Sequence, residues 1–251
     1  MKRVVVVSLG GTVMTLLAAA LVTVTPMAQA AGPTSCEGSS SVEVEACFEM
    51  NEAPEATTMI DSGPNGLHAP INQDGLDTGF SYLGAIGYHW ARKGPNALPV
   101  APERIIQIPD NDNLDPGPNS DTFTVEIRYR TRENFGNITQ KGQAATRGGQ
   151  WKIQNPQGRP SCLFKGADGR VATRSPVALN DNQWHVLTCV RTPTSVTLSV
   201  DGVQRNQKRG LTGTINNKKP MTIGGKINCD QVNTTCDYFS GQIDYVRITR
   251  G

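Results

Sequence analysis

The sequence predicts an all-β fold, and three observations lead to that prediction. Short runs that alternate apolar and polar residues recur between clusters of turn-forming residues. The 26 glycines and 16 prolines are scattered along the whole chain of 251 residues. No amphipathic helical stretch of useful length occurs. Many short strands at this spacing favour an antiparallel β-sandwich or a β-barrel.

The clearest expected strand covers residues 121–133, DTFTVEIRYRTRE. In this run Phe123, Val125, Ile127 and Tyr129 project to one face, while threonine, glutamate and arginine side chains project to the other. Further strands are expected in residues 183–192, 194–204, 219–226 and 241–250. By contrast, the turn-rich residues 51–119 predict long loops at the rim of the fold, with only short apolar pieces such as 105–108 available for strands.

The N-terminus has the features of a secretory signal peptide. Lys2 and Arg3 precede a long apolar stretch, and small residues follow at positions 28–30. We therefore expect residues 1–30 to be a signal peptide, residues 31–251 to form one domain, and the protein to be extracellular (secreted). The apolar stretch is long enough to span a bilayer, so an uncleaved anchor is the alternative.

Charge gives no reason to expect nucleic acid or a membrane surface as a partner. Removing residues 1–30 takes away two of the 24 basic residues and no acid, which leaves 22 bases against 22 acids. A neutral chain without basic runs has little long-range attraction for anionic polymers or lipids.

All six cysteines follow the expected cleavage site. An even number of cysteines in an exported chain predicts disulfides, and neighbours in the sequence suggest three pairs. The expected pairs are Cys36–Cys47, Cys162–Cys189 and Cys229–Cys236. The spacing does not fit a zinc site, because no CxxC pair is present.

His185 and Cys189 raise the question of a catalytic dyad. In a strand they lie on one face about 13 Å apart, whereas a nucleophile and its base must approach to about 3 Å. We therefore expect Cys189 to reach Cys162 on a neighbouring strand, His185 to lie at the surface or rim, and Trp184 to face the core. No other catalytic motif occurs, and Glu126 is the single carboxylate where two-carboxylate chemistry would need a pair. The sequence thus predicts no enzyme.

Three segments together resemble a known family. They are NQWHVLTCVRTPTSVTLSVDG at residues 182–202, FSGQIDYVRI at 239–248, and ACFEMNE with MIDSGPNGLHAPI within 46–71. They are similar to the paired strands, the closing strand and the opening strand of laminin G-like, concanavalin A-like lectin/glucanase domains. The resemblance spans residues 46–249 and implies an antiparallel jelly-roll β-sandwich.

The resemblance also implies one structural calcium ion. Asp61 and Asp244 match positions that would supply carboxylates, and Asn65 or nearby carbonyls could complete the oxygen shell. The alternative is that Asp61 caps a turn and that Asp244 pairs with a base such as Arg247. A second acidic run holds Asp110, Asp112 and Asp115, but it lacks the spacing of an EF-hand loop and is interpreted as a solvated turn.

A glycan site usually offers an aromatic platform beside a few polar groups. The candidates are Tyr88 and Trp90 in the loop-like segment, together with Trp151. We therefore expect a non-catalytic module that binds an extracellular glycan or another cell-surface component. Two alternatives remain open: a polysaccharide-active glycosidase or lyase on the same sandwich, and a structural envelope protein without a small ligand.

Overall fold

The computed structural model describes residues 43–72, 75–94, 104–117, 121–227 and 237–251. The chain divides into two units, Met1–Gly32 and Pro33–Gly251, and every described residue belongs to the second. The expected signal peptide lies outside the described residues and stays a prediction. Among the helices of the described segments, none has the length and apolar character that crossing a membrane requires.

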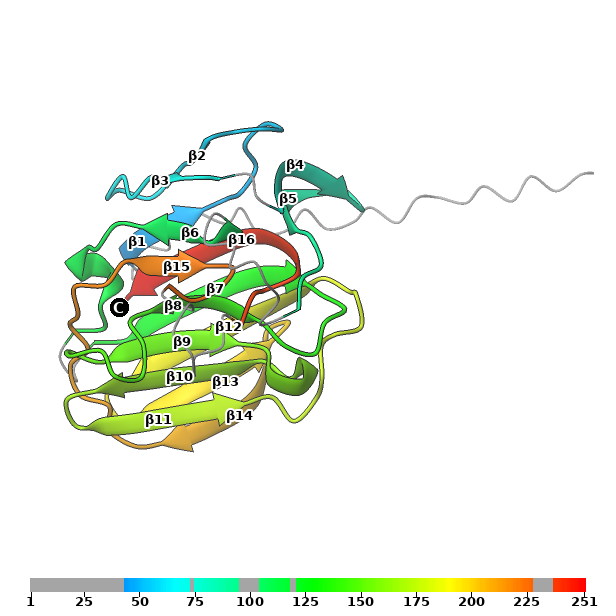
Figure 1. The fold of residues 1–251 in the computed structure, drawn as a ribbon. Helices are drawn as coiled ribbons and strands as arrows, with labels where there is room; N and C mark the ends of the chain where they lie inside the picture. The colour runs from blue at the N-terminus through cyan, green and yellow to red at the C-terminus, as the bar shows by residue number, and fades with distance from the viewer. Residues whose placement is uncertain (1–42, 73–74, 95–103, 118–120, 228–236) are drawn as a thin grey trace, which may run out of the picture. The chain divides into compact units, whose positions relative to one another are not determined.

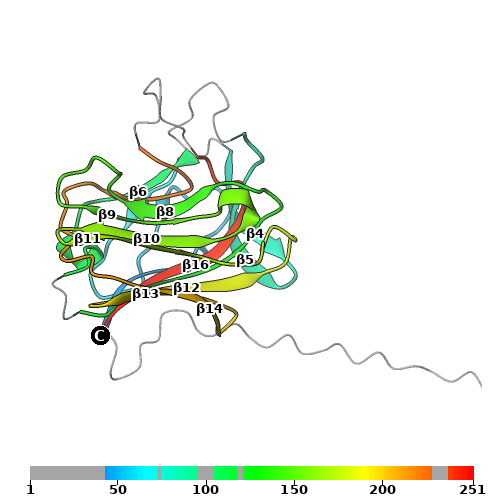
Figure 2. The ribbon, with the colours of Figure 1, turned by 90° about the horizontal axis from the view of Figure 1, so that it is seen from below.

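The larger of the two stacked sheets has eight strands, and every neighbouring pair is antiparallel (Figures 1 and 2). Along the sheet the order is β14 (Val203–Arg209), β13 (Ser195–Val200), β12 (His185–Thr192), β7 (Phe123–Arg130), β16 (Gly241–Arg250), β5 (Ala85–Trp90) and β4 (Leu76–Tyr82), and β1 (Glu43–Phe48) also pairs with β16.

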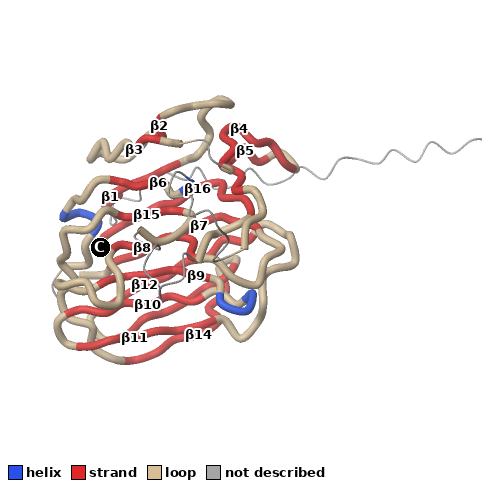
Figure 3. The backbone as a smooth tube through the Cα atoms, in the orientation of Figure 1, coloured by secondary structure: helices blue, strands red, loops and turns tan. Residues whose placement is uncertain are grey.

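The second sheet has six antiparallel strands. Its order is β11 (Gly169–Arg174), β10 (Ser161–Gly166), β9 (Gln150–Gln154), β8 (Asn137–Lys141), β15 (Met221–Ile223) and β6 (Ile106–Ile108). A two-stranded sheet is formed by β2 (Thr58–Met59) and β3 (Ala69–Pro70), and two short 3-10 helices are η2 (Asp112–Leu114) and η3 (Pro156–Gly158). Figure 3 shows how strands dominate the described chain.

The core lies between the two large sheets, and alternating residues of both sheets fill it. The four apolar residues at positions 123, 125, 127 and 129 of β7 are fully buried, as their spacing predicts. From the other sheet, Trp151 and Phe164 reach the same core, where their rings lie 6.0 and 6.4 Å from that of Phe123. Burial of such side chains between two sheets is the main stabilisation of a sandwich. The predicted jelly-roll sandwich is confirmed.

Residues 51–119 were expected to form long rim loops with short apolar pieces for strands: the piece at 105–108 does contain β6, but the expectation of loops is wrong for residues 76–90. Strands β4 and β5 pair with each other, and β5 pairs with β16, which extends the eight-stranded sheet. Gly87 resembles a turn residue in the sequence but lies inside β5. A Cβ at Gly87 would lie 2.4 Å from the carbonyl oxygen of Ile243. The glycine therefore permits a close approach between two backbones, which is the other common reason for a glycine in a strand.

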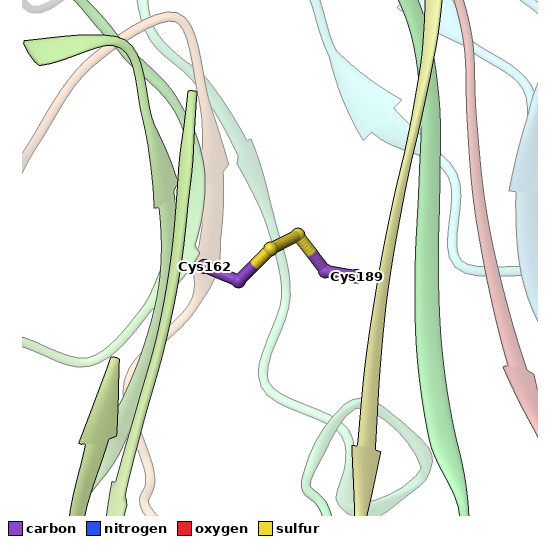
Figure 4. The surroundings of a disulfide bond; sticks show 2 residues. All are labelled: Cys162 and Cys189. Carbon is purple, nitrogen blue, oxygen red and sulfur yellow. A yellow bond between two sulfur atoms is a disulfide. The ribbon is translucent and has the colours of Figure 1, made fainter. Parts of the chain in front are cut away.

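The disulfide between Cys162 and Cys189 is confirmed (Figure 4). The two cysteines do not lie on neighbouring strands as expected: Cys162 is in β10 of the six-stranded sheet and Cys189 is in β12 of the eight-stranded sheet. The bond crosses the core and joins the two sheets. Cys47 is also disulfide-bonded, whereas Cys36, Cys229 and Cys236 of the other two expected pairs lie outside the described residues.

The structure corrects which face of β12 points inward. Cys189 is fully buried between the sheets, so Trp184, on the opposite face, lies outside the core. Its ring instead packs half-buried against the guanidinium of Arg128, at 4.9 Å. His185 lies beside two carboxylates, with Nδ1 2.8 Å from Asp201 and Nε2 3.2 Å from Asp181. These are contacts at the strand end, and the described residues contain no free thiol that could act as a nucleophile.

Candidate ligand-binding site

A cavity of about 1280 Å³ lies against the outward face of the six-stranded sheet. Its floor comes from strand residues that point away from the core, and its walls come from the loops 142–148 and 216–220. The lining consists of Gln107, Gln140, Gly142, Gln143, Ala144, Ala145, Thr146, Arg147, Gly148, Gln150, Lys152, Gln154, Leu163, Arg170, Asn216, Asn217, Lys218, Lys219, Pro220, Lys226 and Ile227.

The floor follows from the alternation in β9, whose sequence is QWKIQ. Trp151 and Ile153 are fully buried in the core. The intervening Gln150, Lys152 and Gln154 therefore point to the opposite face, into the cavity. On the neighbouring strand, Leu163 lies opposite the central lysine and adds an apolar surface to the floor.

The two wall loops are fastened to each other by backbone contacts. The Asn216 N–H donates to the Gly148 carbonyl at 2.8 Å, and the Asn217 side-chain amide donates to the Gly149 carbonyl at 3.2 Å. Gly148 has a φ of 87°, and a Cβ there would lie 1.7 Å from the Asn216 oxygen. Close backbone packing and the Asn217 side chain therefore hold the two loops together.

Most of the uncharged polar groups that line the cavity are side-chain amides. The side chains of Gln107, Gln150 and Gln154 make no hydrogen bond within the described part of the chain. Each amide therefore has a free donor and a free acceptor facing the cavity. Gln140, in contrast, is held in place because its oxygen accepts a hydrogen bond from the Asn137 amide at 3.1 Å.

The charged side chains of the lining are all basic. Burial and the neighbouring ammonium of Lys226 lower the pKa of Lys152 to about 8, although Asp237 opposes the shift. The Asp237 carboxylate lies 2.6 Å from the Lys226 nitrogen and 3.5 Å from that of Lys152. Lys152 is thus protonated at neutral pH and loses its charge as the pH rises through about 8.

The aromatic residues proposed as a glycan platform are placed elsewhere by the structure. Trp90, Tyr88 and Trp151 are fully buried in the core. The indole N–H of Trp90 donates to the Arg104 carbonyl at 2.9 Å, and that of Trp151 donates to the Leu114 carbonyl at 2.8 Å. A ring enclosed in this way has no face on which a sugar can stack. These residues are corrected from ligand contacts to core residues.

Asp61 caps a turn, which is the alternative that the sequence left open. Its Oδ1 accepts hydrogen bonds from the backbone N–H groups of Cys47 at 2.8 Å and Gly63 at 2.9 Å, and its Oδ2 accepts one from Leu67 at 2.9 Å. Asn65 lies nearby, but its amide donates to the Glu45 carbonyl at 2.8 Å. The carboxylate is nearly buried and ties the first strand to the turn that follows it.

Asp244 pairs with a base, although not with the expected one. Its carboxylate lies 2.6 Å from Arg128, whereas Arg247 pairs with Glu126 at 3.0 Å. Burial raises the pKa of Asp244, and the Arg128 guanidinium opposes that shift.

The proposed calcium ligands do not fit a hard cation as they are arranged. Both oxygens of Asp61 already accept backbone hydrogen bonds, and Asp244 is neutralised by Arg128. The described residues contain no group of three or more His, Cys, Asp or Glu side chains placed to hold a metal ion. Calcium binding by Asp61, Asn65 and Asp244 stays a prediction of the sequence.

Replacing Asp61 with alanine tests whether its carboxylate caps the turn or binds calcium. Three backbone donors would lose their acceptor, so we expect the free energy of unfolding to fall by about 2–4 kcal/mol. Urea denaturation should show the same loss in calcium and in EDTA. A loss seen with calcium but absent in EDTA would contradict the capping role and favour the metal.

The acidic run at 110–115 is not simply a solvated turn. The buried ammonium of Lys141 lies 2.8 Å from Asp110 and 2.8 Å from Asp115, and it donates to the Asn217 carbonyl at 2.6 Å. Asp115 is buried, whereas Asp112 is exposed and pairs with Lys218. The carboxylates thus surround a lysine of the chain itself. Because Asn217 belongs to the cavity wall, this cluster also supports the site.

The comparisons with known proteins bear on this architecture. A laminin G family model, described as the concanavalin A-like lectin/glucanases superfamily, matches residues 104–251. The chain belongs to this superfamily. The resemblance found in the sequence is therefore confirmed. No curated protein sequence matches the chain.

Several solved structures are similar to this laminin G-like fold at low sequence identity. One is the binding domain of Paraclostridial Mosquitocidal Protein 1, with TM-score 0.55, 13% identity and coverage of 83% of this chain and 48% of that chain. Another is the ligand-binding domain of botulinum neurotoxin serotype D in complex with N-acetylneuraminic acid, with TM-score 0.53, 10% identity and coverage of 82% and 46%. The chain spans about half the length of these toxin domains.

A third similar structure is domain 4 of AbnA, a GH43 extracellular arabinanase from Geobacillus stearothermophilus, in complex with arabinotriose. Its TM-score is 0.52 at 15% identity, and the match covers 84% of this chain and 93% of that chain. At these identities the likenesses show the fold alone.

Proposed function

We propose that the protein is a non-catalytic glycan-binding module that holds its ligand against the outward face of the six-stranded sheet. The observation that carries this proposal is the row of free amides of Gln107, Gln150 and Gln154 in a cavity of about 1280 Å³. Cavities that take drug-sized ligands are about 300–1,000 Å³, so this one has room for several sugar residues.

The chemistry of the lining suits a sugar. Each sugar hydroxyl is both a donor and an acceptor, and so is each side-chain amide. Leu163 provides an apolar surface for the C–H groups of a ring, between Lys152 of β9 and Ala172 of β11. Directed hydrogen bonds to the amides replace those of the displaced water, and they give the cavity specificity for the ligand.

The lining favours binding over hydrolysis. Glycoside hydrolysis generally needs two carboxyl groups on either side of the scissile bond. The described residues that line the cavity include no aspartate or glutamate. We therefore propose binding without bond cleavage, and incubation with polysaccharide should release no new reducing ends.

The similar structures support a glycan as the ligand. AbnA domain 4 is seen with arabinotriose, and the serotype D domain is seen with N-acetylneuraminic acid. Those complexes belong to those proteins. For this protein we propose an extracellular glycan or another cell-surface component, consistent with the signal peptide that the sequence predicts.

A double variant tests the proposal. A panel of immobilised glycans first identifies a ligand, and titration calorimetry then compares Gln150→Ala/Gln154→Ala with the parent protein. Losing two amide contacts should weaken binding by about tenfold or more. Gln183→Ala is the matched control, because that glutamine is exposed and does not line the cavity. Unchanged affinity in the double variant would refute this site, and release of sugar fragments would refute the absence of catalysis.

A further inference from the structure

The charged residues that line the cavity are all basic. Six basic side chains contribute to the lining, and no acidic residue is found among its described members. The basic residues are Arg147, Lys152, Arg170, Lys218, Lys219 and Lys226. Of these, Arg147, Arg170 and Lys219 form no ion pair within the described residues. Asp237 and Asp112 lie outside the lining and neutralise part of this charge through Lys226 and Lys218. The positive charge that remains on the concave surface attracts anions.

Lys152 lies at the centre of this basic surface. Its ammonium is half-buried in the middle of β9 and shares the Asp237 carboxylate with Lys226. Repulsion from Lys226 contributes to the lowered pKa of Lys152, so its charge is not fully compensated in the protein alone. An anionic group bound beside it would relieve that repulsion.

The basic surface continues beyond the cavity, over the edges of both sheets. Arg170 lines the cavity and is the second residue of β11, the edge strand of the six-stranded sheet. Strand β14 is the edge of the other sheet, and the Asn206 amide donates to the Arg174 carbonyl of β11 at 2.9 Å. The two edge strands lie side by side, at the bottom of Figure 1.

These two edge strands carry five basic residues and no acidic one: Arg170, Arg174, Arg205, Lys208 and Arg209. None of the five forms an ion pair within the described part of the chain. Every residue of β14 is exposed. We name this surface the basic edge. Charged residues on edge strands also hinder pairing with other sheets, and the test below separates that role from ligand binding.

We propose that the ligand is an acidic polysaccharide whose chain fills the cavity and continues over the basic edge, from β11 to β14. The proposal rests on the proposed function, and it adds the charge of the glycan and the path of its chain. A polymer fits better than a single sugar because the unpaired cations extend from one face of the sandwich around to β14. Continuity with the amide-lined cavity favours a glycan over polyanions that carry charge alone, because the hydroxyl groups of an acidic sugar can bond to the amides while its acid groups pair with the cations.

Matched ligands test the charge requirement. Polygalacturonate and its fully methyl-esterified form share one backbone and differ in charge. We expect the acid form to bind at least about tenfold more tightly at low salt, with an affinity that falls as salt rises. Equal binding of the two forms through the cavity would overturn the proposal and leave the proposed function standing. Binding of neither form, with no sulfated glycan binding either, would overturn both.

Matched variants test the path. The short ligand is trigalacturonate, which would fill only the cavity. The double variant Arg205→Gln/Arg209→Gln should therefore weaken binding of the polymer by about fivefold and leave binding of trigalacturonate unchanged. Arg92→Gln/Arg132→Gln removes the same charge from exposed arginines that lie outside both surfaces and should change neither affinity. The double variant Gln150→Ala/Gln154→Ala should weaken the binding of both ligands.

Three results would overturn the proposal. The first is an edge double variant that binds the polymer as the parent does. The second is an edge double variant that self-associates in light scattering but keeps the parent affinity for the polymer. The edge charges would then serve solubility alone. The third is polyglutamate that binds as tightly as polygalacturonate at equal charge, since charge alone would then account for binding. Because the substituted side chains are exposed, the melting temperature should stay within about 2 °C of the parent value.

Discussion

We expect the Lys141→Met variant to lose about 3–5 kcal/mol of the free energy of unfolding. The Lys141 ammonium is fully buried and contacts Asp110, Asp115 and the carbonyl of Asn217. Asp115 is only 3% exposed, and burial raises its pKa while Lys141 opposes the shift. Without the ammonium, a buried carboxylate would be left uncompensated or would have to bind a proton.

Urea denaturation at several pH values measures this effect. In the variant, Asp115 would have a folded-state pKa further above its unfolded value. Its folded state would then bind more protons, so the stability deficit should shrink as the pH falls toward the ordinary range of a carboxyl group and grow above it. Lys218→Met is the control, because Lys218 and its partner Asp112 are exposed, and it should cost under about 1 kcal/mol. An equal loss of unfolding free energy in Lys141→Met and Lys218→Met would contradict the stabilising role of the buried Lys141 cluster.

The Cys162→Ala/Cys189→Ala variant should lose about 2–4 kcal/mol of the free energy of unfolding. The disulfide closes a loop with a sequence separation of 27 residues and joins the two sheets through the core. Its removal gives the unfolded chain more freedom and leaves two small gaps between the sheets. Chemical denaturation of the purified variant, compared with the parent under oxidising conditions, measures the loss.

Ligand affinity is the control measurement for the Cys162→Ala/Cys189→Ala variant. Both sulfurs lie in the core, on the far side of β10 from the cavity. The variant should therefore bind glycan as the parent does at temperatures well below its melting transition. A loss of affinity without a loss of stability would show that the bond shapes the site, contrary to this account.

The sequence predicted the strands whose alternation is strict, such as β7, because one apolar face and one polar face leave a single way to bury the strand. It did not reveal β4 and β5. Glycines interrupt these strands, and the reason for Gly87 is a close approach to the backbone at Ile243, more than 150 residues away in the chain. No local pattern contains that contact.

The site was harder to predict than the fold. Trp151 drew attention as a rare aromatic, yet the informative residues are its polar neighbours Gln150, Lys152 and Gln154. Alternation says that neighbours point to opposite faces, but the opposing sheet decides which face is buried. For the same reason the inward face of β12 was assigned in reverse, with Trp184 inside. Likewise, the contact of Lys141 with Asp115 joins separate segments and appears only in the folded chain.

The central claim is that the outward face of the six-stranded sheet binds a glycan. A crystal structure of the protein with a bound oligosaccharide, refined with the ligand omitted from phasing, tests it most directly. The account predicts sugar density within hydrogen-bond distance of the Gln150 and Gln154 amides, above Leu163. Density on the outer face of the eight-stranded sheet, or at the turn around Asp61, would contradict it.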